Sequence, residues 1–152
     1  MNDIQHISVV INTYNAEEHL KAVLEAVKDF DEIVICDMES TDQTLDIARS
    51  YNCKIVTFPK GNLRIVEPAR QFAIDKASSP WVLVVDADEV VTPELRKYLY
   101  DAIRKDSCPD AIAIPRKNYF MGRMMHSSYP DYILRFLRCN KCSWPPVIHA
   151  AP

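Results

Sequence analysis

The order of apolar and polar positions predicts alternating strands and helices over the first two thirds of the chain. Four short apolar runs rich in β-branched residues have the length of strands that are buried on both faces. These runs are 6–12, 32–37, 54–59 and 81–85. After the first run, the apolar residues Leu20, Leu24 and Val27 recur at helical spacing. Strand and helix alternate four times, which predicts an α/β fold with a mostly parallel sheet flanked by helices.

Polar residues and prolines mark the expected helix starts. Ser40 or Thr41 is the predicted N-cap of the second helix, and Pro68 opens the third helix at a position where proline is tolerated. The fourth helix is predicted to begin after Thr92 as N-cap, with Pro93 as its first residue. These signals agree with the apolar spacing, so the helix prediction does not depend on periodicity alone.

The alternation of strand and helix stops after residue 110. The segments 111–116 and 133–138 are typical of strands, and we expect them to form a short mixed or antiparallel C-terminal extension over the same edge of the sheet. The intervening segment 117–132 is rich in methionine, aromatic and basic residues. It could contact an acceptor or a membrane, and it could equally belong to the core or to a mobile loop. The whole chain, 1–152, is expected to form a single domain.

Composition and charge exclude several classes of protein. A chain of 152 residues with 48% hydrophobic residues can bury one core. Its net charge of −3 argues against nucleic-acid binding through a basic surface. Polar residues near the start interrupt any signal-peptide core, and no window approaches the ~18 apolar residues of a membrane span. Five cysteines without a framework spacing suit a reducing compartment, so we expect a cytoplasmic location.

Three of the predicted strands end in polar residues. These ends are Asn12-Thr13-Tyr14, Asp37-Met38-Glu39-Ser40 and Asp86-Ala87-Asp88-Glu89. In a parallel sheet the carboxyl ends of the strands meet at one edge, where ligands bind. The three carboxylates of the last group repel one another, so a cation or a proton is expected among them. The chain has only two glycines, too few for a glycine-rich phosphate loop. We therefore expect Mg²⁺ or Mn²⁺ to lie between the carboxylates and a bound diphosphate.

Four ordered segments resemble the family-2 glycosyltransferases of the GT-A fold, in particular bacterial members that modify lipopolysaccharide core or other surface glycans. The segments read "VVINTYNAEEHL", "DEIVICDMESTDQT", "ARQFAIDKASSPWVLVVDADE" and, more weakly, "YPDYILRFLR" with a later "VIH". The resemblance implies a Rossmann-like GT-A sheet. It also implies a metal-assisted, inverting transfer of a sugar from a nucleotide-diphosphate donor, with UDP favoured, to a surface-glycan or lipid-linked acceptor.

The resemblance also divides the chain into two halves. Residues 1–110 would bind the nucleotide-sugar, and residues 111–152 would form the acceptor side. The acceptor half is expected to be incomplete, because family members continue beyond the histidine at which this chain nearly ends. An enzyme with a lipid-linked acceptor is expected to associate peripherally with the inner face of the membrane.

Individual residues of the nucleotide half acquire roles from the same resemblance. Thr13, Tyr14 and Glu17 would line the nucleotide pocket. Asp37 would accept a hydrogen bond from a uracil-type N–H group. Arg70 would lie near the nucleotide or its phosphates, although it is followed here by Gln where the family commonly has Asn.

The remaining roles concern the metal and the acceptor. Asp86 would contact the ribose and, through water, the metal, while Asp88 would bind the metal directly. His149 is a further candidate metal ligand, since neutral imidazole can bind metals. An inverting enzyme needs a carboxylate that takes the acceptor proton, and Asp131 is the candidate base.

Simpler interpretations remain open for each of these residues. The carboxylates after the fourth strand could form an ordinary capped turn. Asp37 could be a partner of the following helix dipole, and Arg70 a solvated ion-pair residue. Cys139 and Cys142 resemble half of a zinc site or a redox pair, but they have no second pair at ligand spacing and fit a turn.

Two other functions would also place acidic residues at strand ends of an α/β sheet. The first is a nucleotide-binding or interaction domain of the same fold that lacks a base and an acceptor site. The second is a phosphoacceptor receiver domain, which also gathers acids at strand ends. A receiver needs a lysine at a late strand end and acids earlier in the chain, and this sequence lacks that arrangement.

Overall fold

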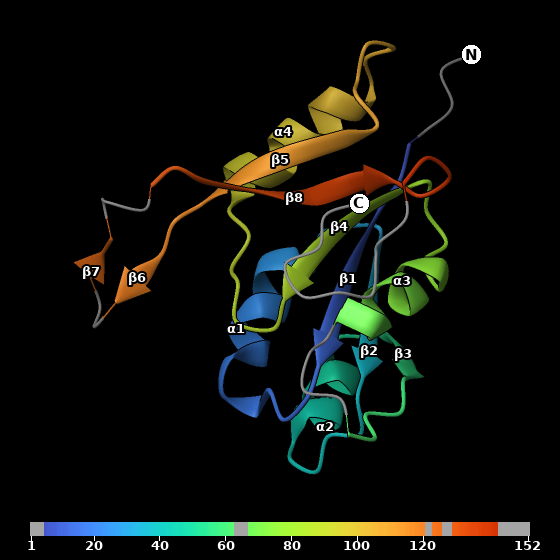
Figure 1. The fold of residues 1–152 in the computed structure, drawn as a ribbon, viewed down its shortest axis with the longest axis vertical. Helices are drawn as coiled ribbons and strands as arrows, with labels where there is room; N and C mark the ends of the chain where they lie inside the picture. Colours follow the sequence, from blue (N-terminus) through green and yellow to red (C-terminus); the bar gives the residue numbers. More distant parts are fainter. Residues whose placement is uncertain (1–4, 63–66, 121–122, 126–128, 143–152) are drawn as a thin grey trace.

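The computed structural model describes residues 5–62, 67–120, 123–125 and 129–142 (Figure 1). Its strands are β1 (Ile7–Thr13), β2 (Glu32–Asp37), β3 (Lys54–Thr57), β4 (Trp81–Asp86), β5 (Ala111–Arg116), β6 (Tyr119–Phe120), β7 (Arg123–Met124) and β8 (Asp131–Arg138). Its helices are α1 (Glu17–Val27), α2 (Thr44–Ser50), α3 (Glu67–Asp75) and α4 (Pro93–Ile103).

The main sheet has the strand order β3-β2-β1-β4-β8-β5. β1 pairs in parallel with β2 and with β4, and β2 pairs in parallel with β3. β8 runs antiparallel to both of its neighbours, β4 and β5. This arrangement confirms the predicted α/β fold with a mostly parallel sheet and an antiparallel extension.

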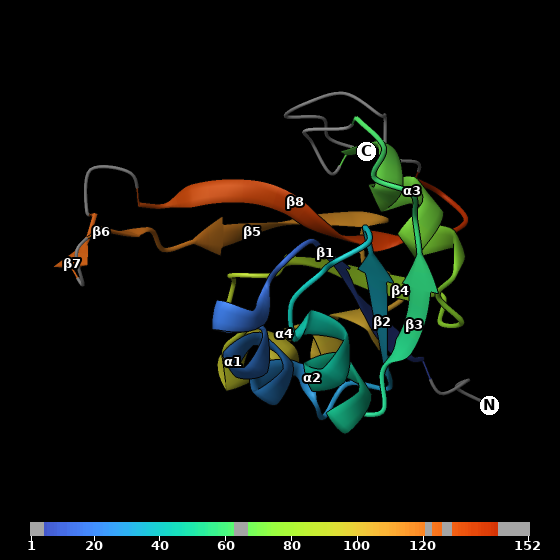
Figure 2. The ribbon, with the colours of Figure 1, turned by 90° about the horizontal axis from the view of Figure 1, so that it is seen from below.

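Helices cover both faces of this sheet (Figure 2). α1, α2 and α4 pack on one face, where Val9 and Ile11 of β1 belong to their core. α3 packs on the other face with Val10. β1 is buried along its whole length, and its side chains alternate between the two cores. An uninterrupted apolar run is therefore needed at the centre of the sheet.

An aromatic pair fastens the antiparallel extension to the parallel strands. The rings of Trp81 on β4 and Phe136 on β8 stack with their centroids 5.1 Å apart and their planes 3° from parallel. The guanidinium of Arg138 lies 4.4 Å from the centroid of the Trp81 ring. This contact fixes the position of β8 beside β4, and with it the side chain of Arg135, one residue before Phe136.

The predicted helix starts are confirmed in one case and wrong in another. Thr92 caps α4 by accepting a hydrogen bond from the backbone N–H of Leu95, and Pro93 is the first helical residue. α2 begins at Thr44, after Gln43, so neither Ser40 nor Thr41 is its N-cap. Those two residues bond to other strand-end groups instead, as described below.

The third strand is shorter than predicted. It ends at Thr57, whereas the apolar run extends to Pro59. Proline has no N–H to donate to a neighbouring strand, which is consistent with the early end of the pairing.

Candidate functional site

The carboxyl ends of β2, β1 and β4 meet at one edge of the sheet, as the sequence predicts. The strand register places Thr13 of β1 opposite Asp37 of β2. On its other side β1 places Asn12 opposite Asp86 of β4. Residues from three separate segments of the sequence are thus brought together, and they form two neighbouring groups of polar side chains.

The first group surrounds the buried carboxylate of Asp37. The hydroxyl of Thr13 donates to Asp37 Oδ1 at 2.7 Å. Ser40 donates twice, from its backbone N–H to Oδ2 at 2.8 Å and from its hydroxyl to Oδ1 at 2.6 Å. Asp37 is only 1% exposed. A buried carboxylate needs such donors, and here they hold it in one orientation.

The loops that follow β1 and β2 are bonded to each other above this carboxylate. Asn15 donates its backbone N–H to the hydroxyl of Ser40, and its side-chain oxygen accepts the backbone N–H of Thr41. Glu17 accepts the backbone N–H of Gln43. Asn15 has a φ of 48°, in the left-handed region. The tightly turned loops explain why Ser40 and Thr41 do not cap α2.

Tyr14 lies exposed beside this group. Its ring is 45% accessible, and the ammonium of Lys60 lies 4.7 Å from the ring centroid. The backbone N–H of Lys60 in turn donates to the carboxylate of Glu39, which has a φ of 65°. Tyr14 therefore presents an exposed ring directly after Thr13, the residue whose hydroxyl bonds to the buried Asp37. Of the predicted nucleotide residues, Thr13, Tyr14 and Asp37 lie side by side, while Glu17 braces the neighbouring loop.

The second group is a set of arginine–carboxylate pairs around Asp86. Arg70 of α3 donates to Asp86 Oδ1 at 2.8 Å. Arg135 of β8 donates to both oxygens, at 3.1 Å to Oδ1 and 3.0 Å to Oδ2. Arg135 also lies 3.4 Å from Glu89 Oε1. Arg70 and Arg135 are almost buried, with 5% and 12% of their side chains exposed.

These contacts set the charge of the two carboxylates in opposite directions. Burial by itself raises the pKa of Asp86, but the hydrogen bonds from Arg135 and the charge of Arg70 outweigh it and lower the pKa well below its usual range. Burial and the neighbouring charge of Asp86 raise the pKa of Glu89. Glu89 also accepts the backbone N–H of Asp86, which closes the turn after β4. Asp86 is thus the firmly ionised carboxylate of this group.

The network continues to the predicted base, Asp131. Arg116 lies 3.6 Å from Glu89 Oε1 and donates to Asp131 Oδ2 at 2.8 and 3.1 Å. Asn118 donates to the same oxygen at 3.1 Å. Hydrogen bonds from Asn118 and Arg116 lower the pKa of Asp131. The structure therefore connects Asp131 with Asp86 through a continuous chain of charged groups.

Asp88 differs from its neighbours in the acidic turn. Its side chain is exposed, and among the described residues it has no hydrogen-bond or ion-pair partner. Carboxylate oxygens suit Mg²⁺ and Mn²⁺, and Asp88 faces solvent beside the anchored Asp86. The described part of the chain brings no three acidic, histidine or cysteine side chains into a ready metal site. The exposed carboxylate of Asp88 is open to a cation, the oxygens of Asp86 are bonded to arginines, and the predicted ligand His149 lies outside the described residues.

The sequence pattern places Ser40 at this sheet edge but does not indicate that it bonds to Asp37. The pattern also does not indicate Arg116 and Arg135 as partners of the carboxylates. Asn12 also went without a role. It is 7% exposed, and its side-chain amide has no hydrogen-bond partner among the described residues. The alternating pattern of "ILRFLR" was the available signal for Arg135, because it puts the arginine on a face of a strand that borders β4.

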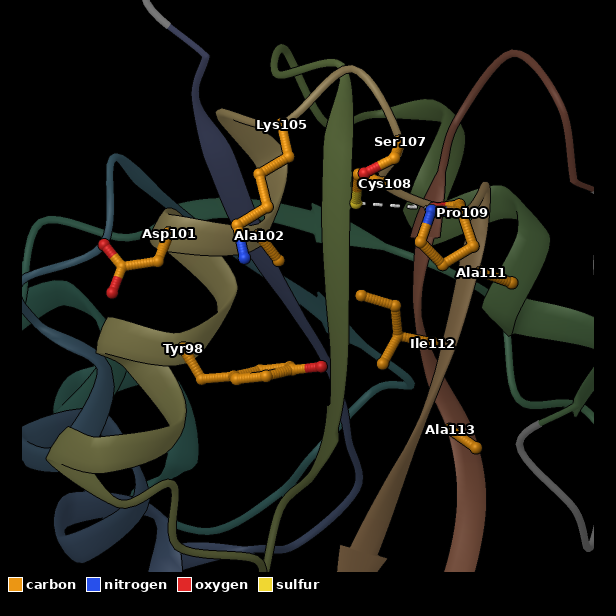
Figure 3. A pocket seen from close by; sticks show the side chains of 10 residues that line it. All are labelled: Tyr98, Asp101, Ala102, Lys105, Ser107, Cys108, Pro109, Ala111, Ile112 and Ala113. Atoms are coloured by element: carbon orange, nitrogen blue, oxygen red, sulfur yellow. Dashed lines mark hydrogen bonds between the residues drawn. The ribbon is translucent and has the colours of Figure 1, made fainter.

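A separate hollow lies between α4 and the start of β5 (Figure 3). Its lining includes Tyr98, Lys105 and Ile112, and the thiol of Cys108 in its rim donates to the Pro109 carbonyl oxygen. The first residue of β5 pairs with Leu137, which pairs with Val82 near the amino end of β4. The hollow therefore lies toward the opposite end of β4 from the carboxylates, and it carries no converging set of catalytic groups.

Two further expectations concern cysteines and membranes. All five cysteines are free, and Cys139 and Cys142 lie in the turn after β8, as predicted. Within the described ranges, no helix is both long and apolar enough to cross a bilayer.

Comparison with known proteins identifies the family. The family model described as "Glycosyl transferase family 2" matches residues 8–149. The chain is 30% identical over 118 residues to the lipopolysaccharide core biosynthesis glycosyltransferase LpsC of Rhizobium meliloti, covering 76% of this chain and 44% of LpsC. Four curated relatives that it matches are covered over 34–44% of their length.

Solved structures agree with the fold. Residues 1–349 of S. aureus TarS bound to UDP-GlcNAc align with a TM-score of 0.62 and 27% identity, covering 78% of this chain and 36% of that one. Glucosyl-3-phosphoglycerate synthase from Mycobacterium tuberculosis, with Mn²⁺, UDP and glucosyl-3-phosphoglycerate, aligns with a TM-score of 0.52 and 23% identity, covering 68% and 41%. These matches confirm the GT-A fold inferred from the four sequence segments, and the chain belongs to glycosyl transferase family 2.

Proposed function

We propose that this chain carries the donor site of a metal-assisted, inverting glycosyltransferase that uses a nucleoside-diphosphate sugar, with UDP as the nucleotide. The observation that carries the proposal is the meeting of two groups at one sheet edge. The Thr13–Asp37–Ser40 group offers a rigid acceptor, and the Asp86 group lies on the next strand but one. A base and a diphosphate need such neighbouring sites.

The Asp37 group suits the base of the nucleotide. Its carboxylate is held by Thr13 and Ser40, so it can accept an N–H from a uracil without a change of rotamer. The exposed ring of Tyr14 provides a face on which the base can stack. The binding of UDP-GlcNAc by TarS, a relative in fold, supports UDP as the nucleotide.

The Asp86 group suits the diphosphate. Asp88 would hold a divalent cation directly, with Asp86 acting through water, and the bound cation would offset the charge of the departing diphosphate. The Mn²⁺ in the mycobacterial synthase of similar fold supports a divalent cation here. Arg70 and Arg135 add fixed positive charge next to the same position.

The acceptor hydroxyl must lose a proton as its oxygen attacks the sugar. In an inverting displacement, the bond from this oxygen to the anomeric carbon forms as the bond to the diphosphate breaks. We assign the proton transfer to Asp131, which lies on the strand next to β4. Hydrogen bonds from Asn118 and Arg116 lower its pKa and keep it in the ionised form that can take a proton.

The direct experiment is calorimetric titration of UDP into the protein with Mn²⁺ and then with EDTA. Binding is expected only with the cation and should be lost in Asp88→Ala, because the exposed Asp88 is the direct ligand. The matched control is Asp106→Ala, which removes a carboxylate beyond the end of α4. Binding of UDP without Mn²⁺, or equally tight binding of UDP by Asp88→Ala, would contradict the proposed cation site at Asp88.

A non-catalytic donor-binding domain of the same fold is the alternative. It is favoured by the limited coverage of the relatives, since the chain matches 34–44% of their length. The alternative predicts UDP binding without hydrolysis of UDP-sugar, whereas the enzyme predicts slow hydrolysis that Asp131→Asn abolishes. Release of UDP over hours, measured with a coupled assay, separates the two.

The acceptor is proposed to be a surface glycan or a lipid-linked sugar, as the relationship to LpsC suggests. The arm formed by β6 and β7 extends away from the body of the molecule (Figure 1). Tyr119 and Met125 are exposed in or next to this arm, Tyr132 is exposed near the start of β8, and Lys117 and Arg123 are exposed in the same stretch of the chain. Aromatic and basic side chains together suit the interface of an anionic membrane. Sedimentation with phosphatidylglycerol vesicles, but not with phosphatidylcholine vesicles, is the expected result.

A further inference from the structure

Two arginines, Arg135 and Arg70, together neutralise the carboxylate of Asp86. Both guanidinium donors of Arg135 point at both carboxylate oxygens, at 3.1 and 3.0 Å. Arg70 holds one of the same oxygens from the other side. The carboxylate that precedes the exposed Asp88 is therefore already neutralised within the protein, before any cation arrives.

A divalent cation and Arg135 make competing demands on this carboxylate. Both are positively charged, and each stabilises the ionised form of Asp86, Arg135 by direct hydrogen bonds and the cation through an intervening water. A cation that approaches Asp86 therefore meets the repulsion of Arg135 or must displace it. The cost of displacement is reduced by a second partner, because Glu89 Oε1 already lies 3.4 Å from the same guanidinium.

The two arginines are unequal in their ability to move. Arg70 lies on α3, against the core, and is 5% exposed. Arg135 lies on β8, with 12% of its side chain exposed, and its side chain crosses from one strand to the next. The guanidinium of Arg135 already lies between two carboxylates, 3.0 Å from Asp86 Oδ2 and 3.4 Å from Glu89 Oε1. Arg135 therefore has a second carboxylate partner at hand if a cation displaces it from Asp86.

We propose that Arg135 is a built-in counter-ion of Asp86, which a divalent cation displaces and which the diphosphate of the donor then binds. This inference rests on the proposed donor site and adds the order of its assembly. Before the donor binds, Arg135 weakens binding of the cation alone. When the diphosphate is present it offers Arg135 new oxygen partners, so the cation and the nucleotide strengthen each other's binding, and by the same factor.

The test measures Mn²⁺ affinity in the absence of nucleotide, by electron paramagnetic resonance of free Mn²⁺. Arg135→Gln should bind Mn²⁺ roughly tenfold more tightly than the wild type, a factor within the ordinary range of coupling between sites. At saturating Mn²⁺, the same variant should bind UDP roughly tenfold more weakly, because one phosphate partner is gone. A pair that is only structural predicts no gain in Mn²⁺ affinity.

The matched control is Arg138→Gln on the same strand. Arg138 pairs with Asp110 and covers Trp81, at the opposite end of β4 from Asp86. The Arg138→Gln variant loses the same charge as Arg135→Gln. Its Mn²⁺ affinity should stay within about twofold of the wild type because distant surface charges are screened. A tenfold gain in this control as well would mean that net charge alone sets the affinity, and would overturn the proposal.

A second variant covers the chance that Arg135→Gln does not fold. Arg135→Lys keeps the charge but cannot donate to both oxygens in parallel, and it should raise Mn²⁺ affinity roughly threefold. Thermal unfolding of each variant identifies those that remain folded. If a folded Arg135 variant binds Mn²⁺ as tightly as the wild type or more weakly, the proposal that Arg135 is the counter-ion of Asp86 is overturned.

Failure of this inference is distinguishable from failure of the donor site. If wild-type protein binds UDP only with Mn²⁺ while Arg135 variants bind Mn²⁺ as tightly as the wild type does, the proposed donor site is supported. The proposed role of Arg135 as a counter-ion of Asp86 is then contradicted. If the Arg135 variants gain Mn²⁺ affinity but UDP never binds, the competition between Mn²⁺ and Arg135 is supported. The proposed binding of Arg135 to the diphosphate is then contradicted. No Mn²⁺ binding by any variant overturns both.

Discussion

The two polar groups of the site are neutralised by different means. Around Asp37 the partners are two hydroxyls and a backbone N–H, all from residues within the first 40. Around Asp86 the partners are guanidinium groups from α3 and β8, and Arg135 is 49 residues distant along the chain. The first pocket is built from neutral dipoles and local turns. The second is built from charges carried by separate elements.

Because of this difference, the Asp37 group should keep its geometry when cations are added, whereas the Asp86 group should change. Neutral donors lose little when salt or cations are added, so the Asp37 pocket keeps its shape whatever ion is present. The Asp86 group depends on charge pairs whose partners compete with a cation. One strand end is therefore suited to recognising a fixed shape, and the other to sensing a charge.

The largest effect is expected from Asp86→Asn. The substitution leaves two almost buried arginines without their common carboxylate, and uncompensated buried charges cost about 3 kcal/mol of unfolding free energy. Denaturant unfolding measures the loss. The matched control is Asp88→Asn, which should change stability by less than about 0.5 kcal/mol because Asp88 is exposed. Equal losses in both variants would mean that the arginines do not depend on Asp86.

Asp37→Asn should cost less, about 2 kcal/mol, since one amide oxygen remains while the amide nitrogen faces the N–H of Ser40. The substitution leaves the Asp86 pairs in place, so the salt dependence of the unfolding free energy should stay as in the wild type. Thr13→Val is the matched control, because it removes only one of the donors to Asp37. It should lower the unfolding free energy by about 1 kcal/mol. A strong salt dependence that disappears in Asp37→Asn would contradict the neutral character of this pocket.

Acid should destabilise the protein through the Asp86 group. The pKa of Asp86 in the folded protein lies below its value of about 3.9 in an unfolded chain. Its stabilisation is therefore fully present above the unfolded pKa and is lost as the pH falls through the folded pKa. Unfolding free energy measured between pH 7 and pH 2 should drop below about pH 4, and Asp86→Asn should flatten that drop. An equal drop in the variant would assign acid sensitivity elsewhere.

The smallest effect is expected from Glu89→Gln. The pKa of Glu89 is raised by burial and by Asp86, so its charge contributes little net stability at neutral pH. A glutamine oxygen can still accept the N–H of Asp86. The unfolding free energy should change by no more than about 0.5 kcal/mol, measured at pH 7. A loss as large as that of Asp86→Asn would show that Arg135 depends on both carboxylates equally.

Much of the fold could be predicted from the sequence, because single segments determine it. The apolar run of β1 and the helical spacing of α1 predict their elements without reference to the rest of the chain. The meeting of Asp37 and Asp86 at one sheet edge was predictable, because the carboxyl ends of parallel strands lie at the same edge. Arg135 was not, because an alternating strand defines its two faces but not its register against β4. The loop bonds of Ser40 were missed for a similar reason, since the partner loop of Asn15 is 25 residues away.

The strand order described above also determines when the polar edge of the sheet is completed during synthesis. β8 lies between β4 and β5 in the sheet, although both are made before it. A chain that has been made only as far as β4 contains Thr13, Asp37 and Ser40, yet it has Asp86 and Glu89 without the arginine of β8. The charge pairs around Asp86 are therefore completed late, when Arg135 has been made and β8 has inserted beside β4.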